Sequence, residues 1–135
     1  MRLRPSALRQ IESKLVPELK LHLLSPQDQI WNEEWKGQTE KEPFWAIFWP
    51  GGQVLSRYLL DSQVAKGKRG LDYNFFSCRP FFSIFCLVLD IGCGCGAQGI
   101  AALKTEAAKV TFNDLDTDAL EAVIHNNHAN SINPQ

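Results

Sequence analysis

The spacing of apolar residues predicts one strand and one helix in the first half of the chain. Leu19, Leu21 and Leu23 alternate with polar residues, which predicts a short half-buried strand between residues 15 and 24, with His22 on its solvated face. After the turn residues at 50–52, apolar positions recur at helical spacing from residue 53 to residue 61, at Val54, Leu55, Tyr58 and Leu59.

The second half of the chain alternates strand and helix patterns. An apolar run at residues 88–91 predicts a buried strand, and residues 98–103 then favour a helix that packs through Ile100, Ala101 and Leu103. Residues 109–112 predict a second strand. Asp116 is a suitable N-cap for a last helix, whose predicted apolar face comprises Ala119, Leu120, Val123 and Ile124. This order of elements predicts an α/β fold with a parallel sheet.

Three alternating glycines follow the strand predicted at residues 88–91. Gly92, Gly94 and Gly96 carry no β-carbon, so the backbone can turn sharply there and a ligand can lie almost against it. The helix expected from about residue 97 points free N–H groups and a positive dipole end at this Gly-loop, which comprises residues 92–96. The Gly-loop therefore predicts a site for an anionic group such as a carboxylate or a phosphate.

Asp90 narrows the choice of ligand. Residues 94–99 satisfy the G-x-G-x-x-G pattern of dinucleotide-binding folds, but that pattern alone is weak. An acid two residues before Gly92 would repel a pyrophosphate and attract an ammonium group. We therefore favour a ligand that carries both an amine and a carboxylate, and keep a nicotinamide-dependent oxidoreductase as an alternative.

Two further stretches hold candidates for the same site. Asp114 ends the strand expected at residues 109–112, about 20 residues past the Gly-loop, where an acid can accept hydrogen bonds from both ribose hydroxyls. Trp45 and Trp49 precede the first predicted helix and could line a ligand pocket. We assign the neighbouring Phe44 and Phe48 to the core.

Composition argues against several classes of function. The 135 residues fit one domain, and a formal net charge of −1 gives no support for nucleic-acid binding through bulk electrostatics. The longest apolar run, at residues 81–89, is far shorter than the ~20 residues that span a bilayer. The four cysteines form no C-x-x-C pair, so we expect no metal site and a reducing compartment.

Residues 1–14 differ in composition from the rest of the chain. The first ten hold three arginines, one serine and no acid, which suits either a partial mitochondrial targeting segment or a solvated basic tail. We therefore expect the folded domain to comprise residues 15–135.

Four stretches together carry a resemblance to a known family: Pro43–Gln53, Leu55–Asp61, Leu89–Ala97 and Asn113–Asp116. In them the chain resembles the electron transfer flavoprotein β-subunit lysine methyltransferases, which are mitochondrial relatives of the ribosomal protein L11 methyltransferases. The Trp-Pro-Gly-Gly element at residues 49–52 is more specific than the Gly-loop. The resemblance runs from about residue 15 to residue 135.

The resemblance implies a Rossmann-like, seven-strand fold and a protein-lysine N-methyltransferase that uses S-adenosyl-L-methionine. This cofactor carries the amine, carboxylate and ribose that the Gly-loop and the two acids would bind. The implied protein substrate is the electron transfer flavoprotein β subunit. The resemblance also implies a location in the mitochondrial matrix, with the cytoplasm as a second location, and a complete form that is monomeric without nucleic-acid or membrane partners. The implied cofactor-binding residues are Trp49, Asp90, Gly92, Gly94, Gly96 and Asp114.

The chain departs from the family pattern at Gly70–Leu87. These 18 residues separate the basic pair Lys68-Arg69 from the strand that follows, and they hold five of the eight phenylalanines without helical or alternating order. We interpret the segment as an insertion that derives from a retained intron or a gene-model error. A genuine substrate loop is the alternative.

A second departure is that the chain reaches Gln135 after about two of the family's seven strands. The family's acceptor-lysine machinery follows its fourth strand, so the resemblance assigns no catalytic residue here. We expect an incomplete, inactive N-terminal part of the methyltransferase domain, unstable because one edge of its central strand lacks neighbours. A ribosomal-protein methyltransferase and a non-catalytic cofactor-binding remnant are the alternatives.

Overall fold

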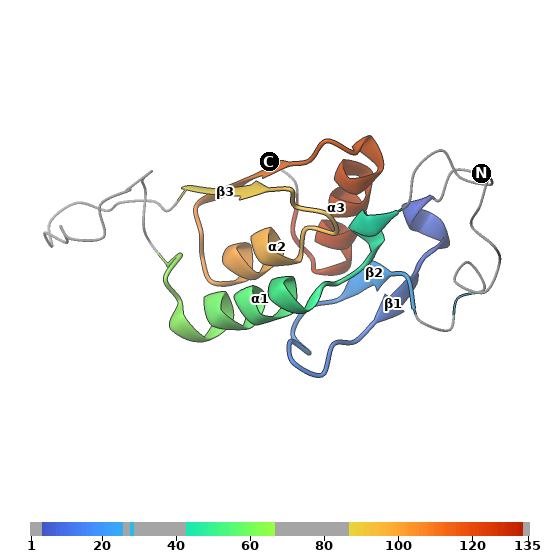
Figure 1. Cartoon of the computed structure of the whole chain (residues 1–135). Helices are drawn as coiled ribbons and strands as arrows, with labels where there is room; N and C mark the ends of the chain where they lie inside the picture. The colour runs from blue at the N-terminus through green and yellow to red at the C-terminus, as the bar shows by residue number, and fades with distance from the viewer. Residues whose placement is uncertain (1–3, 26–27, 29–42, 67–86, 134–135) are drawn as a thin grey trace, which may run out of the picture.

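The computed structural model describes residues 4–25, 28, 43–66 and 87–133 (Figure 1). Three α-helices and two short 3₁₀ turns alternate with four strands in this part of the chain. Their bounds, in chain order, are η1 Pro5–Ala7, β1 Arg9–Ile11, β2 Leu21–Leu23, η3 Phe44–Ala46, α1 Pro50–Ser62, β3 Leu87–Ile91, α2 Ala97–Lys104, β4 Lys109–Asn113 and α3 Thr117–Ala129.

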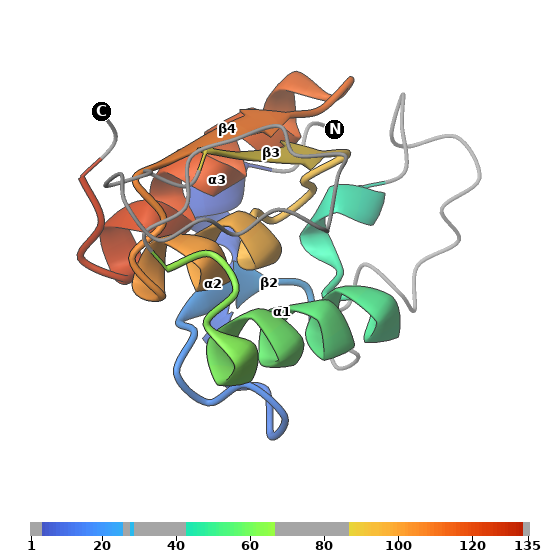
Figure 2. The same ribbon diagram turned by 90° about the vertical axis from the view of Figure 1, so that its left-hand side faces the viewer.

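Strands β3 and β4 form the parallel pair that the sequence predicted. Val88 lies opposite Val110 and Asp90 lies opposite Phe112, and α2 connects the two strands as a βαβ unit. In Figures 1 and 2 the helices lie on one side of this sheet. The α/β class is thus confirmed, and the described residues hold two sheets of two strands each.

The outer face of β3 is open to solvent. Leu87, Leu89 and Ile91 are 52%, 54% and 73% exposed, because alternate residues of a strand point to opposite faces and only the inner face is covered by helices. Leu87 also marks the end of the proposed insertion. The other residues of the insertion, 70–86, lie outside the described residues.

The second sheet is an antiparallel hairpin near the N-terminus. Leu21 and Leu23 of β2 are buried as predicted, whereas its partner β1 lies within residues 1–14, which we expected to be a tail. Residues 9–11 have no alternating pattern of their own, so β1 forms through its pairing with β2. His22, expected to be solvated, is only half-buried, and its ring contacts that of His125 on α3, with centroids 4.3 Å apart.

Helix α1 begins three residues earlier than predicted, and of the four positions of its predicted apolar face only Leu59 packs against the core. Pro50 occupies the first helical position, where its missing N–H costs no hydrogen bond. Val54, Leu55 and Tyr58 were expected to pack inward, but they are 63%, 47% and 54% exposed. Ser56 is fully buried instead, since a small side chain lets α1 approach its neighbour α2 closely.

The main core lies between α2 and the hairpin. Ile100 and Ala101 are fully buried there as predicted, with Phe48 packed against their cluster. Two further predictions of core positions were also wrong: Phe44 is 56% exposed and Ile124 is 51% exposed. The buried face of helix α3 is shifted from the predicted one. The residues that it buries are Ala119, Ala122, Val123, Asn126 and Asn127.

Candidate cofactor site

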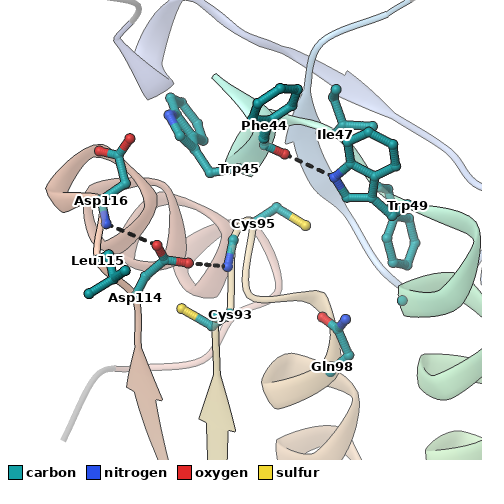
Figure 3. Close-up of a pocket in the computed structure, with 14 residues that line it drawn as sticks. Phe44, Trp45, Ile47, Trp49, Cys93, Cys95, Gln98, Asp114, Leu115 and Asp116 are labelled. Carbon is teal, nitrogen blue, oxygen red and sulfur yellow. Dashed lines mark hydrogen bonds between the residues drawn. The ribbon is translucent and has the colours of Figure 1, made fainter. Parts of the chain in front are cut away.

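A cavity of about 400 Å³ lies at the carboxyl ends of β3 and β4 (Figure 3). Three segments line most of it: residues 44–49, residues 92–95 of the Gly-loop, and residues 114–116 after β4. Gly52 of α1 and Gln98 of α2 complete the wall. Ligands of open α/β sheets bind at this end of the strands, and the volume falls in the usual range of small-molecule sites.

The backbone of the Gly-loop turns through left-handed conformations at all three glycines. The φ angles are +65° at Gly92, +50° at Gly94 and +79° at Gly96. A β-carbon built at Gly92 would meet no atom within 4 Å, so the protein leaves space there. At Gly96 it would meet Val123 at 2.8 Å. Gly92 and Gly94 line the cavity, whereas Gly96 serves close packing against α3.

Asp114 lies on the cavity wall and holds two loops together. One of its carboxylate oxygens accepts a hydrogen bond from the Gly94 N–H at 2.8 Å, and the other accepts from the Asp116 N–H at 2.9 Å. Each oxygen has two lone pairs, so each can accept a further hydrogen bond from a ligand hydroxyl. The acid predicted to bind ribose is therefore present at the cavity, between the ends of the two strands (Figure 3).

Asp90 lies behind the Gly-loop rather than on the cavity wall. Its carboxylate accepts a hydrogen bond of 2.9 Å from the N–H of Gly99, in the first turn of α2. Burial raises the pKa of Asp90 above its ordinary value, the Gly99 hydrogen bond opposes this, and the nearby charge of Asp114 raises it further. Its contact with a ligand amine stays a prediction.

An aromatic wall faces Asp114 across the cavity. Trp45 is buried, whereas Trp49 is 51% exposed at the rim and donates a hydrogen bond of 3.1 Å from Nε1–H to the carbonyl oxygen of Phe44. The rings of Phe44 and Trp49 also contact each other, with centroids 6.2 Å apart. In Figure 3, Trp49 and Asp114 lie on opposite sides of the cavity. Both tryptophans line the cavity, as the sequence predicted for a pocket.

The two cysteines of the Gly-loop are buried free thiols. Burial is the main cause that raises the pKa of Cys93 to about 12 and that of Cys95 to about 11. Both groups are therefore neutral at pH 7 and poor nucleophiles. Among the residues that the structure describes, no cluster of three or more His, Cys, Asp or Glu side chains could hold a metal ion.

Sequence reasoning missed Asn126 as a member of this region. The residue is fully buried on α3, and its side chain donates a hydrogen bond of 2.9 Å to the Cys95 carbonyl oxygen in the Gly-loop. The available signal was its helical spacing from Ala119 and Val123, which puts an amide on an otherwise apolar face. A buried amide needs partners, and here the loop supplies one.

Within the described ranges, none of the helices has the length and apolar character needed to cross a membrane.

Comparison with known proteins finds similarity to protein methyltransferases. The family model of ribosomal protein L11 methyltransferase (PrmA) matches residues 83–135, and no solved structure matches significantly. The electron transfer flavoprotein beta subunit lysine methyltransferase of mouse (Mus musculus) is 41% identical over 121 residues, which are 89% of this chain and 40% of that protein. The human (Homo sapiens) protein of that name is 40% identical over 89% of this chain and 39% of its own length.

A bacterial relative extends the comparison. The ribosomal protein L11 methyltransferase of Acinetobacter baumannii (strain AYE) is 29% identical over 87% of this chain and 42% of its own length. The chain thus spans about two-fifths of the length of these relatives. The resemblance seen in the sequence is confirmed: the chain is similar to the electron transfer flavoprotein β-subunit lysine methyltransferases and, at lower identity, to a ribosomal protein L11 methyltransferase.

Proposed function

We propose that this chain carries the S-adenosyl-L-methionine site of a protein-lysine N-methyltransferase that acts on the electron transfer flavoprotein β subunit. The observation that carries the proposal is the cavity in which Asp114 and the Gly-loop face an aromatic wall. The names of the similar proteins in mouse and human support the reaction and the substrate.

The residues present fit the chemical groups of this cofactor. The open space beside Gly92 and the bare backbone at Gly94 suit a ligand that lies against the chain, and Asp114 suits the ribose hydroxyls. Trp49 offers an exposed ring to an apolar or cationic part of the ligand. Asp90, behind the loop, adds a negative charge that favours the ligand amine near this end of the sheet.

The contribution of this chain to the reaction is to bind and orient. When bound, the cofactor supplies a methyl group on a sulfonium ion. The hydrogen bonds of Asp114 and Asp90 hold the Gly-loop and the start of α2 in one arrangement, which fixes where a ligand can lie. Positioning of this kind supplies much of the rate enhancement in a displacement reaction. We assign no catalytic residue to this chain.

Calorimetric titration tests the cofactor assignment. We expect the chain to bind S-adenosylhomocysteine, the product form of the cofactor, and not to bind NAD under the same conditions. Binding of NAD alone would replace the proposal by that of a nicotinamide-dependent oxidoreductase.

A methyl-transfer assay tests the substrate. The chain is incubated with labelled S-adenosyl-L-methionine and either purified electron transfer flavoprotein β subunit or ribosomal protein L11, and label in lysine is measured. Label in the flavoprotein subunit supports the proposal, and label in L11 alone would overturn the substrate. Cofactor binding without label in either protein would show that this chain binds the cofactor without turnover, as expected for an inactive form.

We also propose a location in the mitochondrial matrix, supported by the three arginines among the first ten residues. A fluorescent protein fused after residue 135 should enter mitochondria, and deletion of residues 2–14 should leave it in the cytoplasm. Cytoplasmic fluorescence from the undeleted chain would contradict this proposal.

A further inference from the structure

Asn126 joins three segments that are far apart in the sequence. Its side-chain oxygen accepts a hydrogen bond of 2.8 Å from the backbone N–H of His22 in β2, and its Nδ2 donates one of 2.9 Å to the carbonyl oxygen of Cys95. The residue itself lies on α3 and is fully buried. One amide group therefore connects the hairpin, the last helix and the Gly-loop.

The bond to Cys95 fixes one peptide unit of the cavity wall. The carbonyl of Cys95 and the N–H of Gly96 belong to the same planar unit. Its carbonyl accepts from Asn126, and its N–H donates to the carbonyl oxygen of Cys93 at 2.7 Å. Of the two residues that flank this unit, Cys95 and Gly96, the glycine adopts a left-handed conformation and restricts the backbone little. The orientation of this unit therefore depends on one partner inside the loop, Cys93, and on one outside it, Asn126.

Asn130 provides a natural comparison one helical turn later. Its side chain donates to the Lys20 carbonyl oxygen at 2.7 Å and accepts from the Lys20 N–H at 3.0 Å, so it also anchors the chain that leads into β2. Its Nδ2 further donates to the backbone carbonyl of Asn126. Asn130 thus ties the hairpin to α3 as Asn126 does, but its bonds go to Lys20 and to α3 itself, not to the Gly-loop.

We propose that Asn126 is a positioning residue for the cofactor site, which sets the orientation of the Cys95–Gly96 peptide and couples the β1–β2 hairpin to the cavity. The proposal rests on the proposed cofactor. It assigns to the N-terminal hairpin a part in cofactor binding, although the hairpin residues themselves do not line the cavity.

Replacement of Asn126 by aspartate separates the two hydrogen bonds of this side chain. In Asn126→Asp the acceptor for the His22 N–H remains, while an ionised carboxylate faces the Cys95 carbonyl without a proton to donate. We expect the affinity for S-adenosylhomocysteine to fall by about tenfold at pH 8. As the pH falls, the carboxylate introduced in this variant becomes protonated and can again donate a hydrogen bond. The ratio of the wild-type affinity to the affinity of Asn126→Asp should therefore return toward one.

The affinity of the wild-type chain is measured at each pH as a control, because its own titratable groups also change charge over this range. Those that face this region are the His22 and His125 rings and the Cys95 thiol. Asn126→Ala, which stays neutral, should lose a similar affinity at every pH. Asn130→Ala should lower the melting temperature but keep the wild-type affinity at temperatures where the chain is folded.

The outcomes separate this proposal from the proposed function. Wild-type affinity in folded Asn126→Ala, or an equal loss in Asn130→Ala, would overturn the positioning role. Absence of binding by the wild type would reject the proposed cofactor instead. In that case amide exchange still decides: faster exchange at Gly96 and Ala97 in Asn126→Ala than in Asn130→Ala supports the anchor, and equal exchange refutes it.

Discussion

The Asp114 carboxylate accepts a hydrogen bond of 2.8 Å from the Gly94 N–H, across 20 residues of sequence. An acid at the end of β4 thereby holds the loop that follows β3. Because its second oxygen accepts from Asp116, the same carboxylate also shapes the turn into α3. The side chain predicted to bind ribose therefore has a structural task as well, and any substitution there changes both.

Replacement of Asp114 by asparagine should lower both the affinity of the site for the cofactor and the stability of the fold. The amide has only one oxygen, so its NH₂ group must face the N–H of either Gly94 or Asp116, and an unmade hydrogen bond costs about 1–3 kcal/mol. We expect a lower melting temperature and about tenfold weaker binding of S-adenosylhomocysteine in titration calorimetry.

Asp116→Asn is the matched control for Asp114→Asn. Asp116 caps α3 by accepting from the Asp118 N–H, and asparagine is an equally good N-cap. This variant should melt like the wild type. Unchanged affinity in Asp114→Asn would contradict the role assigned to that acid.

Replacement of Asp90 by asparagine should stabilise the fold while weakening the site. Burial first, and then the charge of Asp114, raise the pKa of Asp90, so its ionisation opposes folding as the pH rises above its ordinary 3.8. Asparagine can still accept from the Gly99 N–H without this cost. We expect a melting temperature about 2–5 °C higher at pH 7, a difference that vanishes near pH 3, and weaker binding of S-adenosylhomocysteine.

The affinity of Asp90→Asn decides the ligand assignment, because a neutral side chain no longer attracts an amine. Cofactor affinity equal to that of the wild type would remove the main argument for an amino-acid-bearing ligand. A lower melting temperature at pH 7 would instead show that the carboxylate stabilises the loop.

Replacement of Gly92 by alanine should block the site with little effect on folding. The added β-carbon meets no protein atom within 4 Å, so the change costs only the strain of a left-handed conformation, about 1 kcal/mol. It would, however, fill space beside the cavity wall. We expect binding of S-adenosylhomocysteine to be lost in titration calorimetry.

Gly51→Ala is the matched control for Gly92→Ala. A β-carbon at Gly51 also meets nothing within 4 Å, but this glycine lies in α1 and does not line the cavity. It should bind like the wild type. Full affinity in folded Gly92→Ala would show that the ligand does not lie against this backbone.

The histidine pair between β2 and α3 should make stability depend on pH. Burial, and then the charges of His22 and His128, lower the pKa of His125, so the folded state favours the neutral ring. Stability is therefore present above pH 6.5, the ordinary value, and lost as the pH falls. We expect the wild-type melting temperature to drop between pH 7.5 and pH 5.5.

His125→Gln should show about 2–5 °C less of this drop. His128→Gln removes only an exposed neighbour and should resemble the wild type more closely. An equal drop in His125→Gln and the wild type would exclude the pair as its source.

Local patterns were sufficient to predict most elements of this fold. The strands on either side of α2, the Gly-loop and the cap at Asp116 follow from residues close together in sequence, and the structure confirms them. The helical period of α1 was also correct, but the period does not say which face meets a neighbour. That depends on how α1 packs against α2, a contact between segments distant in sequence.

The parts that could not be predicted depend on such distant contacts. Strand β1 has no pattern of its own and exists through its pairing with β2. Asn126 gains its role from two backbone groups, at His22 and Cys95, that only the folded chain brings to it. For the site, Trp49, Gly92, Gly94 and Asp114 meet at one cavity, whereas ligand binding by any predicted residue stays a prediction.

The contact between Gly99 and Phe112 bears on how glycine patterns are used to identify ligands. A β-carbon at Gly99 would lie 2.2 Å from the Phe112 ring, so this position can hold no larger residue while α2 keeps its distance from β4. The last glycine of the G-x-G-x-x-G pattern therefore measures how near a helix lies to its strand. A match to this glycine in a motif search therefore indicates close packing of a helix on a strand. Proteins that bind chemically different nucleotides can share that packing.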